Sequence, residues 1–355
     1  MWVGFAAYLG VLAAAPALGG RVVWGTILVL VAAFAVAPVL LSHDVYSYVD
    51  YARLGVVHDL DPYVHPPDAV PTDPAFAEVA WTESTSAYGP LFTLATYPLA
   101  WLGVGVAVAV LKAVAALSVL GLAALAARLA AWRGAEPLRA AAFVALNPLV
   151  LVHVVGGAHN DGLTMLLAML GVAAILSARE AAGGAALVAA VATKASAAFV
   201  VPFALLATVR DRSWPKLLAG AALATALVVA SAYLAFGWDW LGGFGLAGEN
   251  QSRTSHMSVP ITFARIAGLD PDPVRAAAAL LYAALVAWLL VWTWRRGDWV
   301  RAAAWAALGL LLATSWLLPW YLIWLLPLAA ISRDRPLQLL ALALTAYQLG
   351  ARIPL

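Results

Sequence analysis

The chain has 355 residues, of which 65% are hydrophobic and 11% charged, and its formal net charge is +2. A water-soluble domain is about half apolar and a quarter charged, so this composition and a mean hydropathy of +0.91 exclude a soluble fold and indicate a polytopic membrane protein. No basic stripe is present and we expect no nucleic-acid partner; with no cysteine, disulfides and Cys-ligated metals are excluded.

Apolar runs that are long enough to cross a bilayer, or shorter where a helix is broken inside a bundle, follow one another along the chain. We read the first run as a retained span, with a cleaved segment as the alternative, because it lacks the positive region of a secretory signal. No repeat or low-complexity linker interrupts the series, so residues 1–355 are expected to form one membrane domain. The predicted spans are 2–18, 22–41, 105–131, 139–155, 162–178, 185–209, 217–236, 273–294, 300–316, 320–331 and 336–349.

The distribution of charge predicts the orientation of these spans, because loops rich in Lys and Arg stay inside. Basic clusters mark the inside at Arg21 and at residues 128–139, 210–216, 295–301 and 333–335. Residues 42–104 are expected to form a large first extracytoplasmic loop with amphipathic surface helices, and residues 237–272 a second loop. Much of the acidic charge of the chain falls in the first loop, at Asp44, Asp50, Asp59, Asp61, Asp68, Asp73, Glu78 and Glu83.

Two segments must depart from simple spans to keep this orientation consistent. Residues 90–102 are expected to lie as a helix on the outer surface, since a span there would turn the arginines of 128–139 outward. Residues 185–209 are expected to go out and return, with an apex at Lys194; one ordinary span with an inverted remainder is the alternative. Two half-spans that meet at a lysine are typical of a functional site, because irregular backbone at that depth must face protein or water.

The stretch "DVYSYVDY" follows the second span directly and predicts an amphipathic helix at the membrane surface. Asp44, Ser47, Tyr48 and Tyr51 recur at helical spacing and share one face. A carboxylate at the edge of the hydrocarbon is partly desolvated, which raises its pKa and makes Asp44 a better general base. The structural alternative is that Asp44 only complements the helix dipole.

Cations on the outer side form a second group of candidates. Burying an ammonium in a span costs about 2.5–3.5 kcal/mol, so Lys194 at the apex indicates an anionic head group. Arg253 and Arg265 run against the positive-inside bias and indicate a counter-anion; a solvated loop is the alternative for "GENQSRTSHMSVP". Lys112 also lies within an apolar run, where a structural partner is the simpler explanation.

Two further motifs lie at outer turns. In "VVGGAHNDGL" Asn160 or Asp161 caps the next helix, which leaves His159 and one other polar group to face a site. A lone His-x-Asp pair is a weak ligand set, so no metal is expected. In "LLPWYLIW" Trp320 and Tyr321 serve either an interfacial aromatic belt or sugar stacking, and "YGP" at residues 88–90 reads as a structural turn.

Five segments in order make the chain resemble the GT-C glycosyltransferases, and most closely the polyprenyl-phosphate-mannose-dependent α-1,6-mannosyltransferase family of actinobacterial lipoglycan synthesis. These segments are "DVYSY" with "DPY", "YGPL", "NPLVLVHVVGGAHND", "TKASAAFVVPF" and "PWYLIWLLPL". The resemblance implies a GT-C-like all-α bundle of about 11–12 transmembrane helices, some broken or short. It also implies a bacterial plasma-membrane protein with its active site on the extracytoplasmic face.

The resemblance further implies a polyprenyl-phosphate sugar donor, used without a nucleotide, cofactor or obligatory metal, and a glycan or lipoglycan acceptor. Its catalytic carboxylate carries over to Asp44. Under the mechanism that we expect, the donor phosphate is bound by Lys194, Arg253 and Arg265. The sugar and acceptor are bound by Tyr48, Tyr88, His159, Asn160, Asp161, Trp320 and Tyr321.

Two other functional classes stay open on the sequence. A transporter or flippase of a lipid-linked or anionic solute also favours a lysine at a half-span apex, but it does not explain so many acids and aromatics in one outer loop. A non-catalytic subunit of an envelope complex needs no cavity that joins Asp44 to Lys194.

Overall fold

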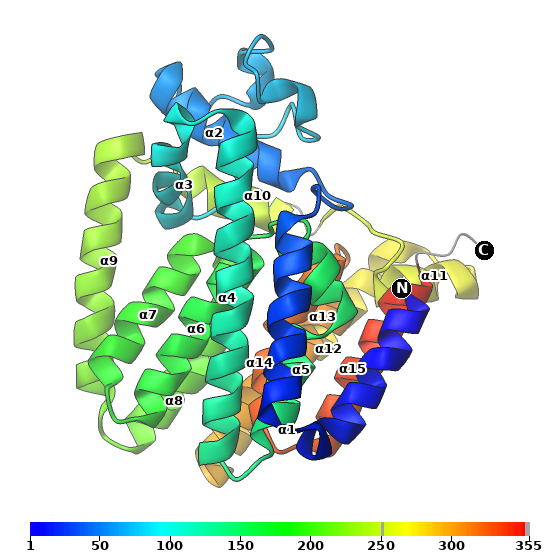
Figure 1. Ribbon diagram of the computed structural model, residues 1–355. Helices are drawn as coiled ribbons and strands as arrows, with labels where there is room; N and C mark the ends of the chain where they lie inside the picture. Colours follow the sequence, from blue (N-terminus) through cyan, green and yellow to red (C-terminus); the bar gives the residue numbers. More distant parts are fainter. Residues whose placement is uncertain (250–251, 352–355) are drawn as a thin grey trace.

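The computed structural model describes residues 1–249 and 252–351 of the chain. All the regular structure in these ranges is helical, which confirms the predicted all-α membrane fold. Most of the long helices stand side by side as a bundle, and α2, α3 and the segments between them cover one end of it (Figure 1). We refer to this as the capped end.

The helices have the following bounds in chain order. They are α1 (Trp2–Val36), α2 (Asp44–Val57), η1 (Pro67–Ala69), η2 (Phe76–Glu78), α3 (Pro90–Thr96), η3 (Tyr97–Trp101), α4 (Val104–Trp132), α5 (Pro137–Ala145), η4 (Val150–Val155), α6 (Asp161–Leu176), α7 (Glu180–Thr193), η5 (Ala195–Val200), α8 (Val201–Arg210), α9 (Trp214–Phe236), α10 (Leu241–Glu249), α11 (Val259–Ala267), α12 (Pro271–Arg296), α13 (Trp299–Ala313), η7 (Pro319–Trp324), α14 (Leu326–Ile331) and α15 (Arg335–Gly350).

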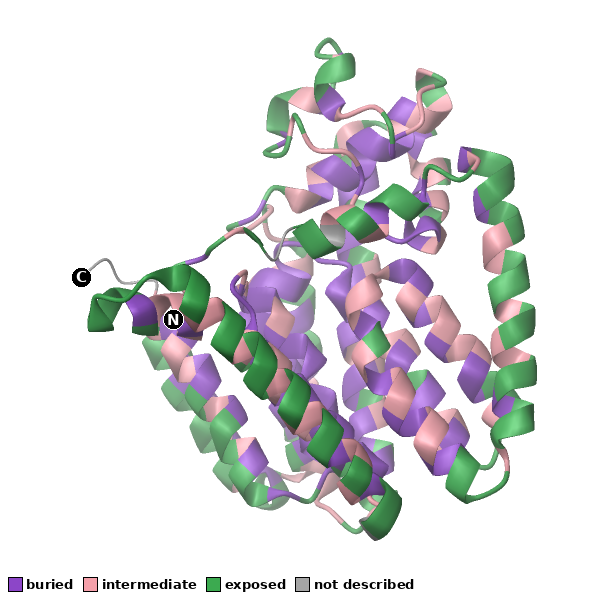
Figure 2. Ribbon diagram, turned by 180° about the vertical axis from the view of Figure 1, so that it is seen from behind, coloured by how far each residue is buried: buried purple, intermediate pink, exposed green. Residues whose placement is uncertain are grey.

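Four of the described helices, α1, α4, α9 and α12, are long and apolar enough to cross a membrane. Shorter apolar helices stand between them. Helices α9 and α12 expose most of their length, in contrast to the buried interior of the bundle (Figure 2). Their exposed side chains include Leu227, Leu234 and Leu281, so these two helices present the apolar surface that a bilayer would cover.

The structure confirms two predicted reversals of the chain. The backbone leaves the helical conformation at Gly19 inside α1, and the chain turns back there, as predicted between residues 18 and 22 (Figure 1). Helix α7 ends at Thr193, Lys194 is extended, and η5 with α8 returns toward the opposite end. A single ordinary span over residues 185–209 is therefore wrong. Residues 90–102 form the short α3 and η3 beside α2 at the capped end, as predicted.

Helix α2 is held onto the loop that follows it by a buried ion pair. The Arg53 Nε donates to both carboxylate oxygens of Asp73, at 2.8 and 3.0 Å, and its Nη1 donates to the Ala100 carbonyl at 3.0 Å. The His58 Nε2 lies 2.7 Å from the same carboxylate. Because Asp44 is the first residue of α2, these bonds fix the position of the residue that the sequence singles out.

Lys112 is the structural lysine that the sequence predicts. It is 4% exposed, and its ammonium donates to the carbonyls of Ala37, Pro38 and Gly156. Ala37 and Pro38 follow the end of α1, where helical carbonyls have no partner within the helix. Gly156 belongs to the turn that leads to His159. One ammonium thus joins the segment before Asp44 to the turn before α6.

We expect Lys112→Met to lower the stability of the protein. The substitution removes the ammonium donor from the carbonyls of Ala37 and Pro38, while the Gly156 carbonyl keeps the Leu40 amide. An unsatisfied buried polar group costs about 1–3 kcal/mol. Thermal unfolding in detergent should show a clear fall in Tm, whereas Lys216→Met, at an exposed lysine, should leave it unchanged. An equal Tm for both variants would contradict this role.

Candidate active site

A cavity of about 460 Å³ opens at the capped end, between the start of α2, the break after α7 and η7. Six of the predicted site residues line it: Asp44, Tyr88, Lys194, Arg253, Trp320 and Tyr321. These residues come from five separate parts of the chain. The fold therefore brings a carboxylate and two cations to one cavity.

The Asp44 carboxylate has a hydrogen-bond donor and a close imidazole neighbour. Its Oδ1 accepts a hydrogen bond from the Trp81 indole at 3.1 Å, and its Oδ2 lies 3.6 Å from the His159 Nδ1. Its side chain is 16% exposed. Burial raises the pKa of Asp44 above its ordinary value, while the Trp81 bond and the positive charge of Lys194 oppose that shift. The carboxylate is thus partly desolvated and still open to the cavity.

Lys194 lies opposite a buried acid as well as beside the cavity. Its Nζ donates to the Asp161 Oδ2 at 2.8 Å and lies 5.4 Å from the centre of the Tyr321 ring. Asp161 is fully buried, and its Oδ1 accepts from the Trp324 indole at 2.7 Å. The extended backbone at Lys194 ends α7, and Asp161 begins α6. The pair therefore joins the end of α7 to the start of α6.

Stacked aromatic rings form one wall of the cavity. The His159 imidazole stacks on Trp320 with 3.7 Å between ring centroids and 17° between planes, and Tyr321 stacks on Trp324 at 4.1 Å and 20°. Trp320, Tyr321 and Trp324 all belong to the 3₁₀ segment η7. His159 is fully buried, so it supports the wall from behind.

The "YGP" turn at residues 88–90 starts α3 and also packs against the end of α7. The Gly89 amide donates to the Thr193 carbonyl at 3.1 Å, and a Cβ at Gly89 would collide with the Ala192 carbonyl. Only glycine allows this close approach of two backbones. The turn thereby places Tyr88 next to the end of α7, where Tyr88 lies edge-on to the buried Tyr48 ring at 4.8 Å.

A second group of contacts reaches the cavity from the outer loops. The Arg253 guanidinium lies 5.0 Å from the centre of the Trp81 ring, which is the geometry of a cation–π contact. Trp81 also lies edge-on to Trp316 at 6.4 Å. Trp81 therefore links the carboxylate of Asp44 to the arginine of the second loop.

Five predicted site residues do not line the cavity. Tyr48, His159 and Asp161 pack directly behind its walls through the contacts above. Asn160 is 4% exposed at the N-cap of α6, and neither end of its side-chain amide has a partner among the described residues. Arg265 is exposed on α11, away from the cavity lining. The neighbouring loop residues Asn250 and Gln251 lie outside the described residues.

Three tryptophans that line the cavity, Trp81, Trp316 and Trp324, are absent from the sequence prediction. Trp81 lies in the acidic first loop, and no local sequence pattern connects it to Asp44. Trp324 was part of the quoted "PWYLIW" motif, but its contact with Asp161 depends on how η7 packs against α6. In the described part of the chain, no group of three His, Asp or Glu side chains is arranged to hold a metal ion.

Helical fold and cavity together define an all-α membrane protein with an acid and paired cations in one site at the end of its bundle. Comparison with known proteins gives the family. Residues 1–210 match the family model described as "Alpha-(1->6)-mannopyranosyltransferase, N-terminal domain", so the chain belongs to this family.

Two curated relatives illustrate the similarity. The chain is 33% identical over 332 residues to Alpha-(1->6)-mannopyranosyltransferase A of Mycobacterium tuberculosis, an alignment that covers 83% of this chain and 63% of the relative. It is 32% identical over 190 residues to the protein of the same name from Corynebacterium glutamicum, an alignment that covers 50% of this chain and 37% of that relative. The chain thus spans less than two thirds of these relatives. No solved structure matches it significantly.

Proposed function

We propose that this protein is a membrane glycosyltransferase that transfers mannose from a polyprenyl-phosphate donor to a glycan or lipoglycan acceptor. The observation that carries the proposal is the shared cavity of Asp44 and Lys194. The names of its relatives supply the sugar and the class of reaction. A non-catalytic subunit would need no such cavity.

We place the reaction on the extracytoplasmic side of a bacterial plasma membrane. The acidic residues of the first loop lie at the capped end, and the arginines at the ends of α4, α8 and α14 lie at the opposite end. Basic loops favour the cytoplasmic side, which leaves the cavity outside. A lipid-linked donor suits that compartment, because its tail stays in the bilayer between the helices.

Asp44 is the proposed general base. It takes the proton of an acceptor hydroxyl while the hydroxyl oxygen forms a bond to the anomeric carbon of the donor sugar. The bond from that carbon to the phosphate oxygen breaks, and its electron pair leaves with polyprenyl phosphate. Attack from the opposite face inverts the anomeric carbon through an oxocarbenium-like state, as in inverting glycosidases.

The departing phosphate is already an anion, so it needs charge stabilisation rather than a general acid. Lys194 and Arg253 line the cavity and supply that positive charge. Arg265 does not line the cavity, and we assign it no contact with the donor. Neither Lys194 nor Arg253 requires a metal ion for this role.

The aromatic wall is the proposed platform for the sugar and acceptor. Trp320, Tyr321 and Tyr88 line the cavity and offer the flat apolar faces on which sugar rings pack. His159, Asn160, Asp161 and Tyr48 lie behind these residues. Their proposed part is to hold the wall and the ion pair in position.

A donor panel tests the proposal directly. The purified protein is supplied with polyprenyl-phosphate mannose, glucose, galactose or arabinose and a mannan acceptor, and release of the lipid phosphate is measured. We expect release with the mannose donor in detergent, where there are no compartments. Binding of the donor without its consumption would overturn the proposal and favour a transporter.

The hydrogen bond from Trp81 predicts a change in pH dependence. Because this bond lowers the pKa of Asp44, Trp81→Phe should raise that pKa. A general base works only when deprotonated, so the acid limb of kcat/KM against pH should move to higher pH. Trp316→Phe, which keeps the bond, is the control and should leave the limb in place. A limb that stays fixed in Trp81→Phe would argue against Asp44 as the base.

A further inference from the structure

A second cavity lies at the end of the bundle opposite the candidate active site. Its volume is about 710 Å³, and Arg133, Arg210, Arg301 and Arg333 line it together with Asp298. The arginines come from the end of α4, the end of α8, the start of α13 and the segment before α15. Four separate connections thus place guanidinium groups around one space, with a single acid in the lining.

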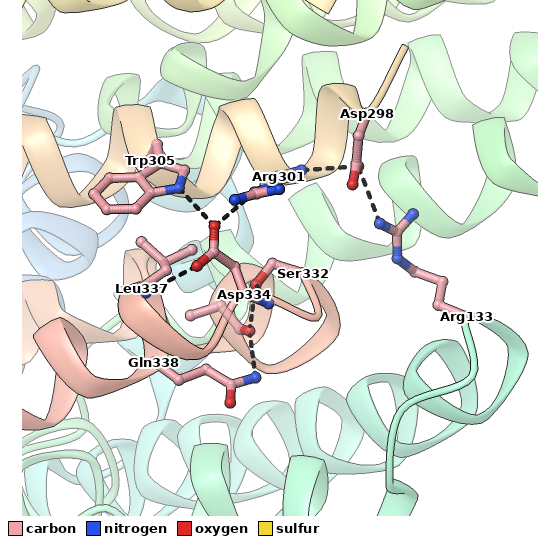
Figure 3. A network of polar contacts seen from close by, with 9 residues as sticks. Arg133, Asp298, Arg301, Trp305, Ser332, Asp334, Leu337 and Gln338 are labelled. Atoms are coloured by element: carbon pink, nitrogen blue, oxygen red, sulfur yellow. Dashed lines mark hydrogen bonds and ion pairs between the residues drawn. The ribbon is translucent and has the colours of Figure 1, made fainter. Parts of the chain in front are cut away.

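The network around Asp334 fixes two of these arginines (Figure 3). Arg133 donates through its Nε to the Ile331 carbonyl at 2.8 Å and through its Nη2 to Asp298 at 3.0 Å. Arg301 donates through its Nε to the Asp334 carboxylate at 2.6 Å, and the Trp305 indole donates to the same oxygen at 2.9 Å. A guanidinium has five N–H donors, so both keep donors for a ligand.

The other two arginines, Arg333 and Arg210, make fewer hydrogen bonds and ion pairs. Arg333 is exposed and has no hydrogen bond or ion pair among the described residues. Among the described residues the Arg210 side chain bonds to its neighbour Asp211 alone, at 3.2 Å, and its guanidinium lies over Gly297. Gly297 has a φ of +87°, a conformation that favours glycine. Glycine at position 297 therefore suits the backbone of this turn, over which Arg210 lies.

An adjoining cavity extends the basic surface. It measures about 230 Å³ and is lined by Arg139, Arg335 and Gln338, by one acid, Glu136, and by Arg333, which borders both cavities. Orientation of the protein requires basic residues on this side, but it does not require them to share cavities, or Arg301 to be held by the buried Asp334.

We propose that this arginine cavity binds the phosphate head group of an anionic phospholipid in the adjacent leaflet, which is the cytoplasmic one in the orientation given above. Guanidinium groups pair with phosphate oxygens through two parallel hydrogen bonds, and basic pockets between membrane helices on this side suit anionic lipids. Val291 and Trp294 are exposed near the end of α12, directly before Gly297, and offer apolar surface to an acyl chain.

The test compares phosphatidylglycerol, phosphatidylcholine with the same acyl chains, and inorganic phosphate on the delipidated protein, by native mass spectrometry and thermal shift. The cavity variant is Arg210→Gln with Arg333→Gln, which leaves the bonds of Asp298 and Asp334 intact. The control is Arg128→Gln with Lys216→Gln, which removes two exposed charges at the same end, outside both cavities.

We expect phosphatidylglycerol to bind the parent protein, and the cavity variant to bind it about tenfold more weakly or worse, with the control unchanged. Equal binding of both phospholipids, or equal losses in both variants, would reduce the arginines to an orientation signal and overturn the proposal. Equal stabilisation by inorganic phosphate would also overturn it, since the ligand would then be a soluble anion. The Tm of each lipid-free variant shows whether it has folded.

Discussion

Asp44→Asn is expected to reduce turnover by about 10²–10⁴-fold, the usual cost of losing a general base. The change removes one proton-accepting oxygen but keeps the size of the side chain and an oxygen for the Trp81 indole. Release of lipid phosphate from the mannose donor measures the loss. Turnover at the parental rate would eliminate Asp44 as the base.

The stability of this variant separates catalysis from folding. Burial raises the pKa of Asp44, so the charged carboxylate is disfavoured in the folded protein relative to the unfolded chain at pH values above its ordinary pKa. A neutral amide should therefore melt no lower than the parent at neutral pH. Asp68→Asn is a matched control, since Asp68 is exposed in the same loop and lies outside the cavity, and it should keep full activity.

Lys194→Met should be both less active and less stable. Removal of one charge-stabilising donor from an active site typically costs about 10²–10³-fold in kcat. The same change leaves the fully buried Asp161 without its cation, and breaking a buried pair on one side costs about 3–5 kcal/mol. Activity and the midpoint of thermal unfolding should fall together.

A double variant distinguishes the two effects. Adding Asp161→Asn to Lys194→Met removes the unpaired charge, and the Asn oxygen still accepts from the Trp324 indole. We expect the Tm to recover while the rate stays low, because the cation that meets the donor phosphate is still missing. Recovery of both would show that Lys194 serves folding alone.

Charge and hydrophobic pattern were sufficient to predict the course of the chain through the bundle. Because Arg21 and residues 128–139 both mark the inside, an even number of crossings must separate them. This placed residues 90–102 on the surface, and the same argument placed a reversal at Lys194. Asp44 could be predicted because a carboxylate that directly follows an apolar run is visible in the sequence itself. The surface helix, the reversal and Asp44 could all be predicted because each depends on adjacent residues or on the side of the membrane on which a loop lies.

The partners of the site residues could not be predicted in the same way. Trp81 reaches Asp44 across 37 positions and Trp324 reaches Asp161 across 163, and no periodicity encodes such contacts. The assignment of Arg265 to the donor rested only on its being an outward arginine, whereas α11 holds it away from the cavity. The same limit applies to the arginine cavity, because the positive-inside pattern shows which side a residue occupies but not which loops meet.

The salt bridge between Lys194 and Asp161 has a consequence for the end of the catalytic cycle. Without substrate, the two acids Asp44 and Asp161 balance the two cations Lys194 and Arg253. Under the proposed reaction a phosphodiester with one negative charge enters, and a phosphate monoester with about −1.5 to −2 charges remains. Asp44 has taken the acceptor proton in the same step, so the total charge of the site is unchanged until that proton leaves. The restored Asp44 carboxylate then repels the spent lipid phosphate, and electrostatics favour release of the product once Asp44 is deprotonated.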